Sequence, residues 1–188
     1  MRTRAAVLIS GNGSNLQALL EAQGQFDVRV VLASKRSAYG LIRARRWGIP
    51  VLVIPAELKK EALDHWLSTQ LIAYRIDIIC LAGFMRILGG QFVSQWHGRI
   101  INIHPSLLPK YKGLEGFESA LRNGDRYGGV TVHNVVEAVD SGEFIAQRSF
   151  LIPPSHGDQH LALHIVEQKT FTEGMRRFQC GKIVRRWL

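Results

Sequence analysis

Short apolar runs alternate with amphipathic segments in the first half of the chain. Short apolar runs are typical of strands buried on both faces of a parallel sheet, and they occur at residues 5–9, 28–33, 51–54 and 76–81, interrupted only by Arg29 and Asp77. Helical periodicity follows them at residues 16–20, 38–47 and 56–74. This alternation predicts an α/β fold: a Rossmann-like, open twisted sheet, mostly parallel, with helices on both faces.

The pattern changes in the second half. A strand is predicted at residues 100–104, and a short helix at residues 118–123. Alternating small apolar and polar residues at 130–136, followed by a returning strand at 144–152, predict an antiparallel hairpin at one edge of the sheet. The last predicted elements are a helix at residues 156–178 and a short strand or tail at 182–188.

The composition mainly excludes classes of protein. The 188 residues are 46% apolar and 21% charged, which fits one globular domain spanning residues 1–188. No stretch approaches the roughly 20 apolar residues needed to span a bilayer, and we expect a cytoplasmic protein without a membrane partner. Only Cys80 and Cys180 are present, which excludes a disulfide framework and a four-cysteine zinc site.

The formal net charge of +9 suits either nucleic acid or an anionic small molecule. Basic residues cluster at Lys35-Arg36, at 43–46 and at 176–186, where they also fit solvated helix faces. No recognition helix, zinc finger or aromatic RNA-binding signature accompanies the charge, so we expect no nucleic-acid partner.

A glycine loop, Ser10-Gly11-Asn12-Gly13-Ser14-Asn15, joins the first strand to the first helix. Glycines permit positive φ and close backbone approach, and the first turn of a helix offers unpaired amides to an anion. The loop lacks the lysine of a nucleotide-triphosphate loop and a third glycine at dinucleotide spacing. It therefore suits a single phosphate or a purely structural turn.

Two polar residues, Asn102 and His104, alternate with isoleucines at the predicted strand end. Alternate side chains of a strand share a face, and Pro105 favours ending the strand there. Together with Asp140, which lies in the predicted hairpin turn, they offer an amide donor, an imidazole and a carboxylate. Without a nucleophile elbow or a zinc ligand set, this trio suits direct transfer to an amine with stabilisation of an oxyanion; a structural role for a lone histidine is the alternative.

Four segments in this order carry a resemblance to a known family. They are SGNGSN, LAGFMRIL, INIHPSLLPKYKGL and VTVHNVVEAVDSGEFIAQ. With this order and spacing, the chain from Ala5 to about Phe171 resembles the phosphoribosylglycinamide formyltransferases, the purine branch of the 10-formyltetrahydrofolate-dependent formyltransferases. The resemblance implies formyl transfer from 10-formyltetrahydrofolate, as co-substrate, to the amine of glycinamide ribonucleotide in de novo purine biosynthesis.

The resemblance also implies roles for individual residues. The catalytic trio would be Asn102, His104 and Asp140, in a mechanism without a metal. The ribonucleotide's phosphate and ribose would be held by Gly11, Asn12, Gly13, Ser14, Asn15 and Glu167. The folate would contact Lys60, Met85, Arg86, Ile87, Leu88 and Asn102. The phosphate-binding half would lie at about residues 1–80 and the folate-binding and catalytic half at about 81–188.

The chain departs from the family pattern near the site. The family usually continues the loop as Gly-Leu-His-Thr-His, where this chain has residues 113–117 as Gly-Leu-Glu-Gly-Phe. Gln168 and Thr172 replace the usual His and Pro. These changes leave two alternatives: a sibling formyltransferase with another amine acceptor, and a non-catalytic phosphate- or nucleic-acid-binding module.

The expected partners are small-molecule substrates, and the expected assembly is a monomer or homodimer. One further pattern, His156, His160 and His164, has the four-residue spacing of a helical metal site, but the sequence places no carboxylate beside it. We therefore expect no metal.

Overall fold

The computed structural model describes residues 2–179, which form two compact units divided between Ile101 and Asn102. The elements of the first unit are β1 (Thr3–Ile9), α1 (Ser14–Glu21), β2 (Phe26–Ala33), α2 (Gly40–Arg46), β3 (Val51–Val53), α3 (Lys60–Ala73), β4 (Ile78–Leu81) and α4 (Gly90–Gln95). The division falls inside β5 (Ile100–His104). The second unit continues with α5 (Gly116–Arg122), β6 (Tyr127–Asn134), β7 (Phe144–Leu151) and α6 (His156–Gln179).

The first unit is built on a parallel sheet in the order β3-β2-β1-β4. Residues 5–9 of β1 are fully buried, because strands pair with β1 on both edges and helices cover both faces. In register, Val7 lies opposite Val31 on β2 and opposite Cys80 on β4. Cys80 has a buried side chain, and burial raises the pKa of its thiol, so it packs as a small apolar side chain.

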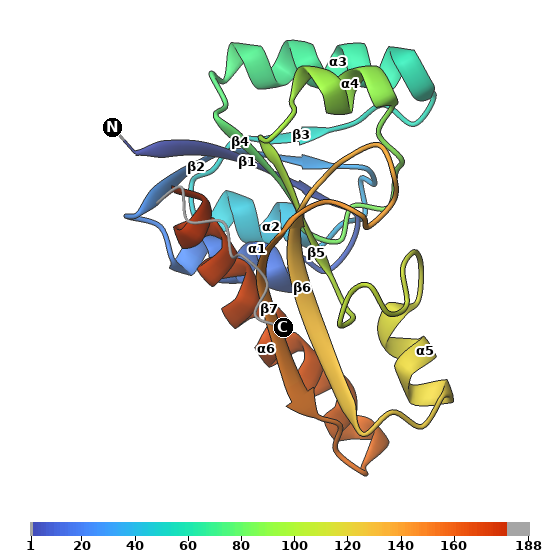
Figure 1. Cartoon of the computed structure of the whole chain (residues 1–188). Coiled ribbons are helices and arrows are strands. Elements are labelled where there is room, and N and C mark those ends of the chain that lie inside the picture. The colour runs from blue at the N-terminus through green and yellow to red at the C-terminus, as the bar shows by residue number, and fades with distance from the viewer. Residues whose placement is uncertain (1, 180–188) are drawn as a thin grey trace. The chain divides into compact units, whose positions relative to one another are not determined.

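The helices of the first unit cover the two faces of this sheet in pairs. In Figure 1, α1 and α2 lie on one face, and α3 and α4 lie on the other. Right-handed crossovers explain the pairing. The chain moves from β1 outward to β2 and β3 on one face and then returns to β4 on the other, so all the loops that follow strands gather at one end of the sheet.

The second unit contains the antiparallel hairpin β6-β7, with Val132 opposite Ala146. The register shifts between Val132 and His133. The extra residue at this shift, Ile145, is on β7, so side chains along β6 keep their alternation and His133 shares a face with Thr131. Helix α6 packs on the hairpin through buried Phe171 and Met175, and a β-carbon on Gly174 would lie only 2.7 Å from Val132 Cγ1.

The predicted fold class is confirmed, including the mostly parallel sheet and the antiparallel hairpin. Several boundaries differ by one to three residues, and the largest difference is in α3, which begins at Lys60 and not at residue 56. Residues 55–58 form a turn in which the Leu58 amide donates to the Pro55 carbonyl. The predicted final strand at residues 182–188 and Cys180 lie outside the described residues. Among residues 2–179, no helix is both long and apolar enough to cross a membrane.

Candidate active site

Asn102, His104 and Asp140 lie together in the second unit. The first two are on β5, and Asp140 is in the connection between β6 and β7. His104 Nδ1 lies 3.3 Å from Asp140 Oδ2, and Asn102 Nδ2 donates to Asp140 Oδ1 at 3.4 Å. The side chains of His104 and Asp140 are 6% and 8% exposed. The structure therefore brings together the three residues that the sequence suggested for catalysis.

The Asp140 carboxylate is held in its charged form. Burial by itself raises its pKa, but a hydrogen bond from His133, the Gly113 backbone amide, and the charges of His104 and His133 outweigh burial. The pKa of Asp140 is therefore lowered from its ordinary value. The Gly113 amide donates to Oδ2 at 2.8 Å, which ties the loop after β5 to this carboxylate.

The His104 ring is fixed at both nitrogens. Nδ1 faces the Asp140 carboxylate, and Nε2 lies 2.8 Å from the carbonyl oxygen of Tyr111. Both neighbours are hydrogen-bond acceptors, so both contacts are satisfied when each ring nitrogen carries a proton. A protonated ring nitrogen in this place is a hydrogen-bond donor.

His133 is a fourth member of this cluster that the sequence reasoning did not assign to the site. It is 2% exposed, and its Nε2 lies 3.4 Å from Asp140 Oδ1 and 3.3 Å from Asn102 Nδ2. Its Nδ1 donates to the Asn134 carbonyl at 2.8 Å. The sequence could have indicated this residue, because His133 lies in a predicted strand, seven residues before Asp140.

In the first unit, the glycine loop packs closely against the start of α2. Gly13 has φ +74° and caps α1, whose first amides have no side-chain cap. A β-carbon on Gly13 would lie 2.7 Å from Gly40 Cα, which explains the glycine. Gly11 and Asn12 are exposed, whereas Asn15 is 8% exposed and its Oδ1 has no hydrogen-bond partner among the described residues.

The segment predicted to receive the folate follows β4 in the same unit. Met85 and Ile87 are 64% and 88% exposed, although both are large apolar residues. The Met85 amide donates to Ser10 Oγ at 2.9 Å, which links this segment to the start of the glycine loop. The Arg86 guanidinium donates to the carbonyls of Pro55 and Leu58, and Leu88 is half-buried. Lys60, at the start of α3, is exposed.

Glu167, the predicted ribose ligand, is buried on α6 and contacts His164 Nδ1 at 3.0 Å through Oε2. This hydrogen bond raises the pKa of His164, although burial opposes it. His160 contacts a different carboxylate, Glu118, at 3.6 Å. Among residues 2–179, no three His, Cys, Asp or Glu side chains are grouped to hold a metal ion.

The altered loop at residues 113–117 has a structural basis. A β-carbon on Gly116 would lie 2.9 Å from His104 Nε2, so the glycine brings the backbone against the His104 ring. Phe117 is 2% exposed and packs on the rings of Phe150 and His160, with centroid distances of 5.8 and 5.7 Å. An aromatic side chain thus anchors the loop at this position.

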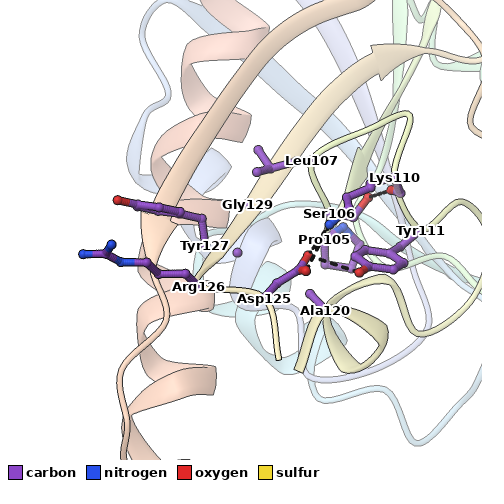
Figure 2. Close-up of a pocket in the computed structure, with 11 residues that line it drawn as sticks. Pro105, Ser106, Leu107, Lys110, Tyr111, Ala120, Asp125, Arg126, Tyr127 and Gly129 are labelled. Carbon is purple, nitrogen blue, oxygen red and sulfur yellow. Dashed lines mark hydrogen bonds and ion pairs between the residues drawn. The ribbon is translucent and has the colours of Figure 1, made fainter. Parts of the chain in front are cut away.

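A separate cavity of about 240 Å³ lies behind the loop that follows His104. Figure 2 shows Asp125 contacting Lys110 and Tyr111 on one side, whereas Arg126 and Tyr127 point away from this group. Lys110 Nζ lies 2.7 Å from Asp125 Oδ2, and the Tyr111 hydroxyl donates to the same oxygen at 3.1 Å. These contacts hold Tyr111, whose carbonyl oxygen lies next to His104 Nε2. Asn102, His104 and Asp140 do not line the cavity.

The α/β fold and the cluster around Asp140 are those of a domain that transfers a chemical group between two substrates. The chain belongs to the formyl transferase family, whose sequence profile matches residues 3–173. This confirms the family suggested by the motifs.

Particular relatives fall within the purine branch. The chain is 47% identical over 158 residues to phosphoribosylglycinamide formyltransferase of Escherichia coli, covering 81% of this chain and 74% of that protein. It is 46% identical over 184 residues to the trifunctional purine biosynthetic protein adenosine-3 of Drosophila melanogaster, covering 93% of this chain. It spans only 14% of that protein's length.

Solved structures agree with this placement. The crystal structure of glycinamide ribonucleotide transformylase 1 from Symbiobacterium toebii superposes with a TM-score of 0.91 at 39% identity, covering 98% of this chain and 91% of that one. The fold is therefore that of this branch, whereas the roles of individual residues stay predictions.

Proposed function

We propose that this chain transfers the formyl group of 10-formyltetrahydrofolate to the primary amine of glycinamide ribonucleotide, as a step of purine biosynthesis. The observation that carries the proposal is the buried cluster of Asn102, His104 and Asp140, in a chain of the formyl transferase family. The names of relatives at 46 and 47% identity support the choice of pathway.

The proposed reaction is a direct displacement. The amine nitrogen of the acceptor attacks the formyl carbon, a carbon–nitrogen bond forms, and the carbonyl electrons move to oxygen. The oxyanion then collapses, the bond from the formyl carbon to N10 of the folate breaks, N10 gains a proton and the new amide nitrogen loses one. The products are formylglycinamide ribonucleotide and tetrahydrofolate.

Each member of the cluster has a task in this reaction. Asn102 Nδ2 and His104 are the hydrogen-bond donors for the oxyanion. Since Asp140 holds Nδ1 of His104, Nε2 is the ring nitrogen that donates, and the oxyanion takes the place of the Tyr111 carbonyl. The charged Asp140 keeps the ring oriented and accepts the amine's proton through water.

The substrate ends are assigned to the remaining predicted residues. The exposed amides of the glycine loop bind the phosphate, and buried Glu167 accepts from the ribose hydroxyls. The exposed apolar side chains of Met85 and Ile87 are available to cover a flat pterin, and Lys60 is available to the folate carboxylates. We further propose one formyltransferase domain over residues 1–188, acting in the cytoplasm as a monomer or homodimer, without a metal, nucleic-acid or membrane partner.

The decisive experiment measures tetrahydrofolate release from 10-formyltetrahydrofolate by the purified chain. We expect release that depends on glycinamide ribonucleotide and is stoichiometric with formylated product by mass spectrometry. Release without acceptor would indicate a hydrolase and would overturn the proposal. Because Gly116 and Phe117 alter the loop beside His104, the assay includes other primary amines, and faster transfer to one of them would move the assignment to a sibling formyltransferase.

A further inference from the structure

Arg43 on α2 lies against the glycine loop, although sequence reasoning did not include it in the site. Its Nε donates to the Asn12 carbonyl at 3.0 Å, and its Nη2 donates to Asn12 Oδ1 at 3.4 Å. The guanidinium carbon lies 5.0 Å from the centroid of the Tyr39 ring. Within residues 2–179, Nη1 has no hydrogen-bond partner. The side chain is thus fixed on the loop with one donor nitrogen open.

Close backbone packing sets the position of this arginine. The Gly40 amide donates to the Gly11 carbonyl at 3.2 Å, so the start of α2 is tied to the loop. The β-carbon position of Gly13 lies 2.7 Å from Gly40 Cα and 3.7 Å from Arg43 Cδ. In contrast, the side chains of Arg45 and Arg46 on the same helix are exposed and, within residues 2–179, make no hydrogen bond to the loop. Arg43 therefore differs from its basic neighbours by its fixed geometry.

A buried polar atom at the same place indicates a ligand. Asn15 is in the first turn of α1 and is 8% exposed, but its Oδ1 has no hydrogen-bond partner in the described part of the chain. A buried amide group without a partner costs about 1–3 kcal/mol. Because an amide oxygen accepts and phosphate oxygens also accept, a ligand removes this cost only if it brings a donor, such as a ribose hydroxyl of a ribonucleotide, to the first turn of α1. The orphan oxygen is independent of the Arg43 contacts.

We propose that Arg43 is a phosphate-binding residue of this enzyme, which contributes Nη1 and a fixed positive charge to the phosphate monoester at the start of α1. The inference rests on the proposed function, because that function supplies the phosphorylated acceptor. A guanidinium suits this task because it is always charged and its remaining donors hold it in one orientation. The residue sets the affinity for the phosphate end of the acceptor and takes no part in bond making.

The test compares three variants: Arg43→Gln, Arg43→Lys and, as a matched loss of charge on the same helix, Arg46→Gln. Each is assayed with glycinamide ribonucleotide and with the same acceptor lacking its phosphate. We expect Arg43→Gln to raise KM for the ribonucleotide by about 10- to 100-fold, as for one charge-assisted hydrogen bond. Its kcat, its KM for formyl folate and its KM for the dephosphorylated acceptor stay within twofold of wild type. The KM of Arg43→Lys for the ribonucleotide lies between the values for wild type and Arg43→Gln.

Several results would overturn the proposal. An equal rise in KM for both acceptors would assign Arg43 a purely structural role, and an equal loss in Arg46→Gln would assign the effect to general charge. No change in Arg43→Gln would remove the residue from the site. Thermal unfolding of each variant identifies any loss of folded protein.

A second measurement separates this proposal from the assignment of the reaction. Binding of inorganic phosphate to wild type, Arg43→Gln and Arg46→Gln is measured by calorimetry, without any folate or amine. If the wild-type chain fails to formylate glycinamide ribonucleotide but loses phosphate affinity only in Arg43→Gln, the reaction is wrong and the phosphate site stands. If phosphate binds wild type and Arg43→Gln equally, the site is wrong whatever the reaction.

Discussion

A single carboxylate, Asp140, organises the hydrogen bonds of the candidate active site. It contacts two histidines, the Asn102 amide and a backbone N–H of the loop after β5. Asp140 itself has φ +46°, a conformation that costs a non-glycine residue about 1–2 kcal/mol. The contacts of its side chain hold it in this conformation, so its replacement affects the loop as well as the chemistry.

Asp140→Asn removes the charge and keeps the shape. We expect kcat to fall by about 10²- to 10⁴-fold, the usual contribution of a positioned proton acceptor. The control is Glu137→Gln, which removes an exposed charge from the same connection, and we expect its kcat to stay within twofold. An unchanged rate in Asp140→Asn would contradict the assigned role.

The same variant tests the pKa of Asp140. Because its folded pKa is lowered, the carboxylate stabilises the native state above its unfolded pKa of about 3.9, and this stability is lost as pH falls through the folded pKa. Urea unfolding of wild type and Asp140→Asn from pH 3 to 7 should therefore show a difference in unfolding free energy that is constant near neutral pH and shrinks in acid. A difference that grows in acid would reverse the assigned direction.

At the scale of elements, the junction of β1, the glycine loop and α2 is the most tightly packed part of the candidate phosphate site. Gly13 and Gly40 touch through their backbones, and a β-carbon on Gly40 would also lie 2.5 Å from Ile9 Cδ1. These glycines therefore fix the spacing between the end of a buried strand and two helix starts. The geometry of the loop depends on this spacing.

Gly13→Ala should destabilise this junction by about 2–4 kcal/mol, because a left-handed φ and a backbone clash add. Gly11→Ala is the matched control, since its φ is not positive and a β-carbon there would meet nothing within 4 Å. We expect Gly11→Ala to change the unfolding free energy by less than about 1 kcal/mol. Urea denaturation of both variants measures the difference, and equal costs would contradict the packing argument.

At the scale of the whole molecule, the net charge of +9 is opposite in sign to the charge of the proposed substrates. A ribonucleotide phosphate and the carboxylates of a folate are both anionic, so the summed field favours their approach. A basic surface by itself also attracts nucleic acid. The dependence of catalysis on salt concentration distinguishes attraction of the substrates from binding of nucleic acid.

Raising the ionic strength from about 0.02 to about 0.3 M shortens the Debye length from about 20 to about 6 Å. We expect kcat/KM for glycinamide ribonucleotide to fall several-fold over this range, with a smaller fall for the dephosphorylated acceptor. Random RNA added at low salt serves as the contrast, and we expect it to leave the rate unchanged. RNA binding that is steep in salt, without turnover of any amine, would favour the non-catalytic alternative.

The sequence by itself determined the fold class and most element boundaries, because buried parallel strands and helical periodicity are local patterns. Short apolar runs such as residues 5–9 and 78–81 are typical of strands buried in a parallel sheet. It also placed Asn102 and His104 on one strand end and supplied the motifs of the formyl transferase family, which the comparisons confirm. It missed the turn at residues 55–58, because helical periodicity continues through those residues.

Only the tertiary structure decided which distant side chains meet. His133 joins Asp140 and Asn102 because β6 lies beside β5 in the sheet, and Arg43 reaches Asn12 because two glycines let α2 touch the loop. Gly116 leaves room for the His104 ring, which no reading of residues 113–117 alone would predict. Periodicity specifies which face of an element is buried, whereas contacts between elements depend on strand register and backbone distance, and these are properties of the folded chain.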